Sequence, residues 1–344
     1  MPTKFILYFT PEFEAYAIKE IEGALGSAKK LSDFGGGIAL METERGRAEL
    51  LPLLSRAKPI LSKHISPIDA EFGISGQGET DLVSILDHVK SQPYIRKGDR
   101  FSIQCRRRGK GSDYTSKDVE VFVGSWFEGS GSIPVFSDTS VMGGPEIKII
   151  QIYLFDKTCY IGFSESGELI NEHNDEYRLH SRSDKVSRSE FKLIEALRKF
   201  NIILKDGKAL DLGAAPGGWS KVLLGLGMKV TAVDPAALDA AVAASPNIVH
   251  LRSISDIPPA DRFDLMVDDM NIDAESSARI LVDLSKLLNP SANAIITLKL
   301  KRGANPFKAV NSAIHILWQA YNIVSIVSLF HNRLEVTVLL SKKG

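Results

Sequence analysis

The sequence predicts an α/β protein in which an α+β region is followed by a doubly wound sheet at the C-terminal end. Beyond about residue 186, short apolar segments alternate with helical stretches, which is typical of strands joined by helices. Before about residue 166, strand-like and helical segments follow one another without this alternation. We expect seven strands in the C-terminal sheet, one of them antiparallel, over residues 209–212, 230–233, 248–251, 265–267, 294–298, 323–329 and 336–340.

The pattern divides the chain into three domains and a linker. Residues 1–60 follow a strand, helix, strand, helix order, which suggests a small α/β or α+β unit. Residues 61–166 contain a strand that runs into a basic loop, an amphipathic helix, and two strands joined by a tight turn. The stretch 167–186 is polar and without clear periodicity, so we expect a linker there, leading to a domain over 187–344.

The composition excludes several classes of protein. The 344 residues include 42 basic and 42 acidic side chains, so the chain is not a polyanion-coating protein, although a local basic patch could still bind RNA. Cys105 and Cys159 stand alone and the seven histidines show no ligand spacing, so we predict neither a disulfide framework nor a metal site. The first residues carry too short an apolar run for a signal peptide, and the expected location is the cytoplasm.

The most specific motif is a glycine loop over residues 209–219, which read ALDLGAAPGGW. An apolar strand ends at Leu212, and glycines then allow a sharp turn into a helix and close contact between a ligand and the main chain. Asp234 ends the second strand about 20 residues further on, where an acid can accept hydrogen bonds from ribose hydroxyls. The loop lacks the G-x-G-x-x-G pattern of dinucleotide sites. The Pro-Gly-Gly step and the acidic Asp211 in the strand suit S-adenosylmethionine better than a dinucleotide. An ordinary strand-to-helix turn is the alternative interpretation.

Four ionisable residues are predicted to meet at the carboxyl edge of this sheet. Asp269 and Lys299 end the fourth and fifth strands, and Glu335 begins the last strand, whose start lies at the same edge if it is antiparallel. Lys192 lies on a helix that opens with a capping box just before the first strand. Each residue alone could be a solvated side chain or a loop cap. Together they suit methyl transfer to an alcohol, with a lysine acting as base if neutral or stabilising an alkoxide if charged.

At these residues the chain resembles a known family. Residues 187–341 resemble the FtsJ-like 2′-O-ribose RNA methyltransferases, through SRSEFKL at 187–193, the glycine loop and a Lys-Asp-Lys-Glu tetrad. The resemblance implies a Rossmann-like fold that binds S-adenosylmethionine, and a catalytic tetrad of Lys192, Asp269, Lys299 and Glu335. It also implies that the cofactor is bound by Gly213, Pro216, Gly217, Gly218, Trp219, Asp234 and Asp256, the last beside the adenine.

The N-terminal half resembles a divergent THUMP module behind a ferredoxin-like subdomain. Together with the FtsJ-like part, this arrangement is similar to that of bacterial 23S ribosomal RNA 2′-O-methyltransferases. Basic residues at the exit of the strand over 101–105 and on the following helix could contact phosphates, although a solvated basic loop remains the alternative. These residues are Arg106, Arg107, Arg108, Lys110 and Lys117.

The sequence therefore predicts a methyltransferase acting on RNA, with ribosomal RNA favoured as substrate. A transfer RNA methyltransferase is the first alternative, because THUMP modules also serve enzymes of that class. A factor that holds the cofactor and binds RNA without catalysis is the second. Methylation of a base nitrogen is disfavoured because the segment after Asp269 lacks the prolines of the usual amino-methylation loop.

Overall fold

The computed structural model describes residues 2–109, 111–135, 147–165, 186–187, 189–204 and 206–344. The chain forms two compact units, Met1–His180 (unit 1) and Ser181–Gly344 (unit 2). Lys110 and nearly all of the predicted linker lie outside the described residues.

Unit 1 begins with a four-stranded antiparallel sheet of order β2-β3-β1-β4. Its elements follow the β-α-β-β-α-β order of ferredoxin-like sheets. They are β1 (Thr3–Phe9), the short 3-10 helix η1 (Pro11–Phe13), α1 (Glu14–Leu25), β2 (Lys29–Asp33), β3 (Ile38–Thr43), α2 (Arg47–Ala57) and β4 (Ser62–Ile68). Since β4 pairs with β1, the first sheet includes residues up to Ile68.

The second sheet of unit 1 has five strands in the order β5-β9-β8-β6-β7. Its elements are β5 (Ala70–Gly73), α3 (Gly78–Lys90), β6 (Arg100–Arg108), α4 (Ser116–Gly129), β7 (Ile133–Pro134), β8 (Lys148–Phe155) and β9 (Thr158–Glu165). Val119 and Val123 of α4 belong to one buried core with Ile150 and Ile152 of β8. Phe127 is also buried there, whereas its neighbour Trp126 is 40% exposed, so Phe127 is a core residue and Trp126 is not.

Unit 2 is built on a seven-stranded sheet of order β12-β11-β10-β13-β14-β16-β15. Its strands are β10 (Lys208–Leu212), β11 (Lys229–Val233), β12 (Ile248–Leu251), β13 (Phe263–Asp268), β14 (Leu288–Lys299), β15 (Tyr321–Val327) and β16 (Glu335–Lys342). β10 to β14 pair in parallel, whereas β16 runs antiparallel to both β14 and β15. The predicted doubly wound sheet with one antiparallel strand is thus confirmed.

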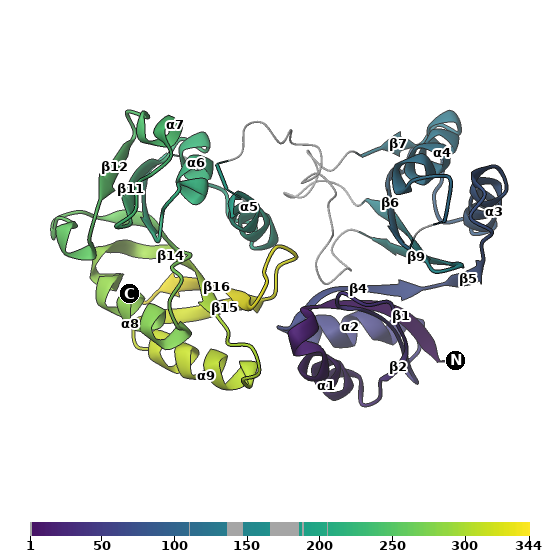
Figure 1. Ribbon diagram of the computed structural model, residues 1–344, viewed down its shortest axis with the longest axis horizontal. Helices are drawn as coiled ribbons and strands as arrows, with labels where there is room; N and C mark the ends of the chain where they lie inside the picture. The colour runs from purple at the N-terminus through teal and green to yellow at the C-terminus, as the bar shows by residue number, and fades with distance from the viewer. Residues whose placement is uncertain (1, 110, 136–146, 166–185, 188, 205) are drawn as a thin grey trace. The chain divides into compact units, whose positions relative to one another are not determined.

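Helices cover both faces of this sheet. They are α5 (Glu190–Lys199), α6 (Gly218–Gly225), α7 (Ala240–Ala243), α8 (Ala274–Leu284) and α9 (Pro306–Leu317), with 3-10 turns η3 (Ile254–Asp256) and η4 (Ser285–Leu287). In Figure 1, α5, α6 and α7 lie above the green and yellow sheet, and α8 and α9 lie below it. The central strands are apolar on both faces because helices bury both, as in Leu210 and Ile296. The order of strands changes direction between β10 and β13, which is where such folds bind ligands.

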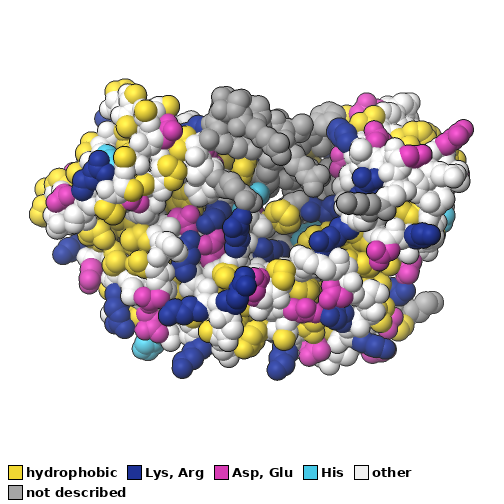
Figure 2. Space-filling view, viewed as in Figure 1, with side chains coloured by type: hydrophobic (Ala, Val, Ile, Leu, Met, Phe, Trp, Pro, Cys, Tyr) yellow, Lys and Arg dark blue, Asp and Glu magenta, His cyan; other side chains and the backbone are white. Residues whose placement is uncertain are grey.

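The surface carries charges of both signs. Figure 2 shows Lys and Arg side chains interspersed with Asp, Glu and apolar side chains over the face drawn. Among the described helices, none combines the length and the apolar character that crossing a bilayer requires.

Candidate active site

The glycine loop follows β10 at the carboxyl edge of the sheet. Gly213 has a φ of +73°, and a Cβ on it would lie 2.8 Å from the Cα and 2.9 Å from the backbone nitrogen of Met270. A side chain therefore does not fit there, because backbone atoms would have to move. The loop and the segment after β13 touch each other directly at this point.

The far side of the loop packs against the start of α5. A Cβ on Gly218 would collide with Ser187 Oγ. The indole Nε1 of Trp219 donates a hydrogen bond to the carbonyl oxygen of Ser189, 2.8 Å away. The backbone nitrogen of Ser187 donates to Glu190 Oε1 at 3.0 Å, which is one bond of the predicted capping box. The glycine loop and the helix that carries Lys192 are thus joined through side chains on both.

A pocket of about 380 Å³ opens beside the loop. It is lined by Gly213, Val233, Asp234, Pro235, Arg252, Ser253, Ile254, Met270, Asn271 and Ile272. The two carboxyl oxygens of Asp234 accept hydrogen bonds from the backbone nitrogens of Ala215 (3.1 Å) and Ala236 (2.8 Å). A carboxylate has further lone pairs, so Asp234 can still accept from a ligand hydroxyl.

The other predicted cofactor residues have different surroundings. Asp256 is exposed and does not line the pocket; its carboxylate accepts from the backbone nitrogen of Ser253 at 3.1 Å and caps η3. Trp219 is only 3% exposed and its indole nitrogen points to Ser189. Pro216 follows a cis peptide bond, and Gly217 has a φ of +114°, a backbone conformation that favours glycine.

The four predicted catalytic side chains form one cluster. Lys299 Nζ lies 2.6 Å from Asp269 Oδ1 and 2.5 Å from Glu335 Oε2. Lys192 Nζ lies 2.7 Å from Glu335 Oε1 and 3.2 Å from Asp269 Oδ2. Each lysine thus bridges both carboxylates, and each carboxylate bridges both lysines. The cluster adjoins the pocket because Asp269 immediately precedes the lining residue Met270.

The antiparallel direction of β16 makes this cluster possible. Glu335 begins β16 and pairs in register with Lys299, which ends β14. Asp269 follows β13, the neighbour of β14, and Lys192 reaches the same edge from α5. The side chains are 6–20% exposed, so solvent screens their charges only in part.

The electrostatics of the cluster favour charged lysine and charged carboxylate. Burial by itself lowers the pKa of Lys299, but the adjacent carboxylates of Asp269 and Glu335 outweigh it, and the pKa lies above its ordinary value. Burial raises the pKa of Glu335, but Lys299 and Lys192 overcome this and hold the pKa below its ordinary value.

One residue of the cluster was missed by the sequence analysis. Thr297 Oγ1 donates to Asp269 Oδ1 at 2.7 Å, and this threonine is almost fully buried. It lies two residues before Lys299 on β14, so both side chains face the same way. That period of two is the signal that could have identified it.

Two buried carboxyl groups on the strands beside the site bond the helices that follow these strands. Asp211 on β10 accepts a hydrogen bond from Ser220 Oγ of α6, and Asp268 on β13 accepts from Ser277 Oγ of α8 and from the backbone nitrogen of Met270. Burial raises the pKa of each to about 7. They fix the helices that follow the two strands, rather than facing a ligand.

The sequence of this region shows to which family the domain in unit 2 belongs. The model of the FtsJ-like methyltransferase family matches residues 185–319. Unit 2 contains an FtsJ-like methyltransferase domain. In this FtsJ-like domain the matched segment includes the glycine loop, Lys192, Asp269 and Lys299, whereas Glu335 lies beyond its end.

Relatives of the FtsJ-like domain include named ribosomal RNA methyltransferases. A ribosomal RNA large subunit methyltransferase M of Alteromonas mediterranea is 31% identical over 211 residues, which is 57% of this chain and 57% of that protein. One of Laribacter hongkongensis is 34% identical over 181 residues, covering 48% of this chain and 50% of that protein. The chain thus spans about half the length of these relatives. The uncharacterized protein MJ1257 of Methanocaldococcus jannaschii is 25% identical over 316 residues, covering 86% of each chain.

The basic residues predicted to bind RNA lie in unit 1 and mostly contact that unit's own atoms. Arg107 donates to the carbonyl oxygens of Ser112 and Tyr114, and Arg108 donates to those of Phe34 and Gly35. The guanidinium of Arg106 lies over the ring of Tyr8, 5.4 Å from its centroid.

Lys117 differs from these arginines. Its side chain is 67% exposed, with an ion pair of 3.8 Å to Glu120. Lys110 lies outside the described residues. The RNA-binding role of the five residues stays a prediction.

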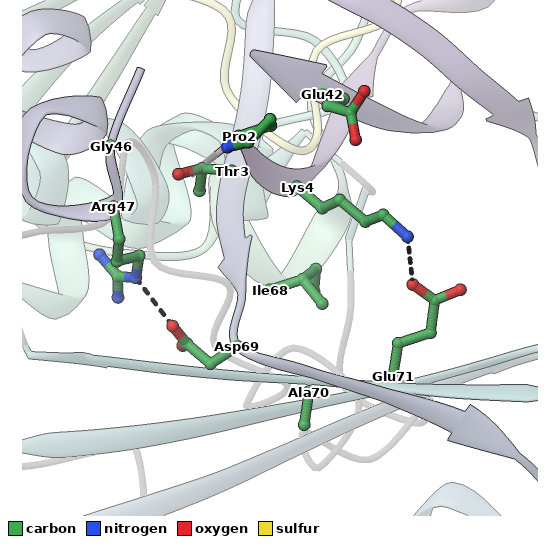
Figure 3. Close-up of a pocket in the computed structure, with 10 residues that line it drawn as sticks. All are labelled: Pro2, Thr3, Lys4, Glu42, Gly46, Arg47, Ile68, Asp69, Ala70 and Glu71. Atoms are coloured by element: carbon green, nitrogen blue, oxygen red, sulfur yellow. Dashed lines mark hydrogen bonds and ion pairs between the residues drawn. The ribbon is translucent and has the colours of Figure 1, made fainter. Parts of the chain in front are cut away.

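Unit 1 also has a pocket, of about 580 Å³, between the first residues of β1, α2 and β5 (Figure 3). Four of its charged side chains form two ion pairs: Arg47 with Asp69 at 3.0 Å, and Lys4 with Glu71 at 2.6 Å. The pocket lacks a glycine loop or a convergent reactive group, so we place the candidate active site in the FtsJ-like domain. Across the part of the chain that the structure describes, His, Cys, Asp and Glu form no group of three or more suited to a metal ion.

Proposed function

We propose that this chain is an S-adenosylmethionine-dependent RNA methyltransferase that acts on a ribose 2′-hydroxyl, with 23S ribosomal RNA as the favoured substrate. One observation carries the proposal: Lys299 Nζ is held between Asp269 and Glu335, at 2.6 and 2.5 Å, at the edge of the sheet that also carries the glycine loop. The relatives named ribosomal RNA large subunit methyltransferases support the substrate class.

The residues beside the loop fit the cofactor. Gly213 lines the pocket and packs directly against Met270 where a side chain would not fit, and Asp234 retains acceptor capacity for ribose hydroxyls. The pocket is lined mainly by apolar atoms and backbone, which suits an adenosine without phosphates. When bound there, S-adenosylmethionine would supply a methyl carbon open to in-line attack by an oxygen nucleophile.

Lys299 would act on the attacking oxygen. Because its pKa is raised, the amine is protonated at neutral pH and cannot accept a proton. Its positive charge would instead stabilise the negative charge that develops on the 2′-oxygen as the hydroxyl proton leaves to water. This favours the cation over the base among the two roles that the sequence left open.

The other three side chains would position this charge. Asp269 and Glu335 each accept from Lys299, which restricts the amine to one place. Lys192 balances the second carboxylate charge, so the cluster holds two positive and two negative groups. Fixing the acceptor hydroxyl against the methyl carbon then lowers the entropic part of the barrier.

Unit 1 would engage the RNA in this proposal. Its ferredoxin-like sheet and the predicted THUMP-like region precede the FtsJ-like domain in the chain, and Lys117 offers an exposed cation for phosphate. The neutral total charge favours a focused patch over a broad basic surface.

The test is methyl transfer from labelled S-adenosylmethionine to RNA by the purified chain. We expect label in ribosomal RNA at a ribose, recognised by alkali resistance of the adjacent phosphodiester bond. Ribose-methylation mapping of total RNA from a deletion strain identifies the substrate. A mark lost from transfer RNA alone would favour the transfer RNA alternative. Cofactor and RNA binding without any transfer would favour the non-catalytic factor.

A further inference from the structure

The loop between β15 and β16, residues 328–334, is fixed to the helix that carries Lys192. Glu195 of α5 accepts hydrogen bonds from the backbone nitrogens of Phe330 (2.6 Å) and His331 (3.1 Å), and from His331 Nδ1 (2.9 Å). Glu195 lies one helical turn after Lys192, so both side chains point from the same face of α5. The loop therefore has a defined position relative to Lys192.

Asn332 connects this loop to Glu335. Its side chain is buried, and its Oδ1 accepts from the backbone nitrogen of Leu329 at 2.7 Å and from Thr337 Oγ1 at 3.1 Å. Since a backbone nitrogen can only donate, the oxygen of the amide must face Leu329, and the amide nitrogen then faces Glu335. Asn332 Nδ2 donates to Glu335 Oε1 at 3.3 Å.

We infer that Asn332 is a positioning residue for Glu335, held in place by the loop that Glu195 anchors to α5. Glu335 Oε1 receives both Lys192 and the Asn332 amide, while Oε2 receives Lys299. With three donors in fixed directions, the carboxylate cannot rotate away from Lys299. Only the effect on methyl transfer rests on the proposed function; the effect on Glu335 does not.

The effect of the Asn332 amide on Glu335 depends on the charged groups around this carboxylate. Lys192 faces it from α5 and Lys299 from β14, and Asp269 lies beyond both lysines; the Glu195–His331 pair lies on the loop side. A donor to the ionised carboxylate lowers its pKa, so replacing the donor raises the pKa of Glu335. Asn332→Asp keeps the shape and the bond from Leu329, but it removes the Nδ2 donor and places a second negative charge against Glu335, and both changes raise the pKa of Glu335.

The first measurement follows the Glu335 carboxyl carbon by NMR in protein labelled with [5-¹³C]glutamate, with Glu335→Gln to assign the signal. We expect Glu335 to titrate at least about one pH unit higher in Asn332→Asp than in the native chain. The matched control is Asn289→Ala, which removes an asparagine bond to the carboxylate of Asp264 (2.6 Å) at the amino edge of the same sheet. Asn289→Ala leaves the Glu335 titration unchanged. A titration of Glu335 that is the same in Asn332→Asp and the native chain overturns the inference.

The second measurement is methyl transfer to RNA. In Asn332→Asp we expect kcat to fall about tenfold or more at pH 7, since a bond to a charged group is lost, with cofactor affinity within about twofold of native. The acid limb of the pH profile of kcat moves to higher pH, which a simple loss of stability would not produce. A native chain that transfers no methyl group contradicts the proposed function, and the NMR titration then still decides the role of Asn332.

Discussion

The indole nitrogen of Trp219 donates a hydrogen bond to the carbonyl oxygen of Ser189 at 2.8 Å. This bond joins the first turn of α6, which follows the glycine loop, to the residue before α5. Lys192 lies three residues further along α5 and donates to Asp269. The glycine loop and the cluster of Lys192, Asp269, Lys299 and Glu335 are therefore connected through one buried aromatic side chain.

Trp219→Phe tests this connection. The variant keeps an aromatic ring but leaves the Ser189 carbonyl without this donor, so we expect the free energy of unfolding to fall by about 1 to 2 kcal/mol. Methyl transfer should fall more than cofactor affinity, because the start of α5 loosens. Chemical denaturation and kinetics measure both. Trp318→Phe, at a site 54% exposed, is the control, and equal effects in the two variants would refute the connection.

Gly213→Ala tests the close approach of the loop and Met270. The added Cβ meets the backbone of Met270 at 2.8 Å, and the φ of +73° itself costs about 1 to 2 kcal/mol for a residue with a Cβ. We expect strongly weakened binding of S-adenosylmethionine in calorimetry. Gly225→Ala, at the end of α6 with no atom within 4 Å of the added Cβ, should bind normally. Native affinity in Gly213→Ala would place the cofactor elsewhere.

Asp268 predicts a pH dependence of stability. Burial raises its pKa to about 7 in the folded chain, well above the ordinary value of 3.8 for an aspartate. The folded state therefore binds more protons than the unfolded state between these values, and the contribution of this group to stability decreases as pH rises from about 4 to 7. Asp268→Asn removes that contribution, so native minus variant stability should be larger at pH 5 than at pH 8. A difference in the free energy of unfolding between the native chain and Asp268→Asn that is the same at pH 5 and pH 8 would contradict the burial of a titrating carboxyl group.

Lys117 and Arg108 should behave differently in RNA binding. Lys117 is 67% exposed, so Lys117→Ala should weaken RNA binding, lower the log–log salt slope by about one unit and leave the melting temperature unchanged. Arg108 donates to Phe34 and Gly35, so Arg108→Ala should lower the melting temperature. Filter binding at several salt concentrations and thermal denaturation separate the two effects. A native salt slope in Lys117→Ala would remove it from the RNA interface.

The sequence was sufficient to predict the sheet of unit 2 and the meeting of the four residues. Strand ends in a parallel sheet share an edge, so Asp269 and Lys299 could be placed together from their positions alone. Glu335 required one further assumption, an antiparallel last strand, which the pairing of β14 with β16 confirms.

Other features depend on contacts that a local pattern does not encode. The sequence of Arg106 to Arg108 does not show whether these side chains face solvent or contact other residues. Only the fold of unit 1 brings the ring of Tyr8 next to Arg106. Asp256 was predicted from the family resemblance, and the pattern did not show that its carboxylate accepts from the backbone nitrogen of Ser253 in η3. Asn332 was not singled out because its significance arises from a loop that α5 holds from 135 residues away.

Transfer of labelled methyl to RNA by Lys299→Ala, measured beside its affinity for S-adenosylmethionine, is the most direct test of the central claim. Lys299 lies in the cluster of two lysines and two carboxylates and does not line the pocket beside the glycine loop. The account predicts methyl transfer lowered by at least about a hundredfold, as for other groups that stabilise developing charge, with cofactor binding retained. Native rates of transfer in Lys299→Ala would contradict it.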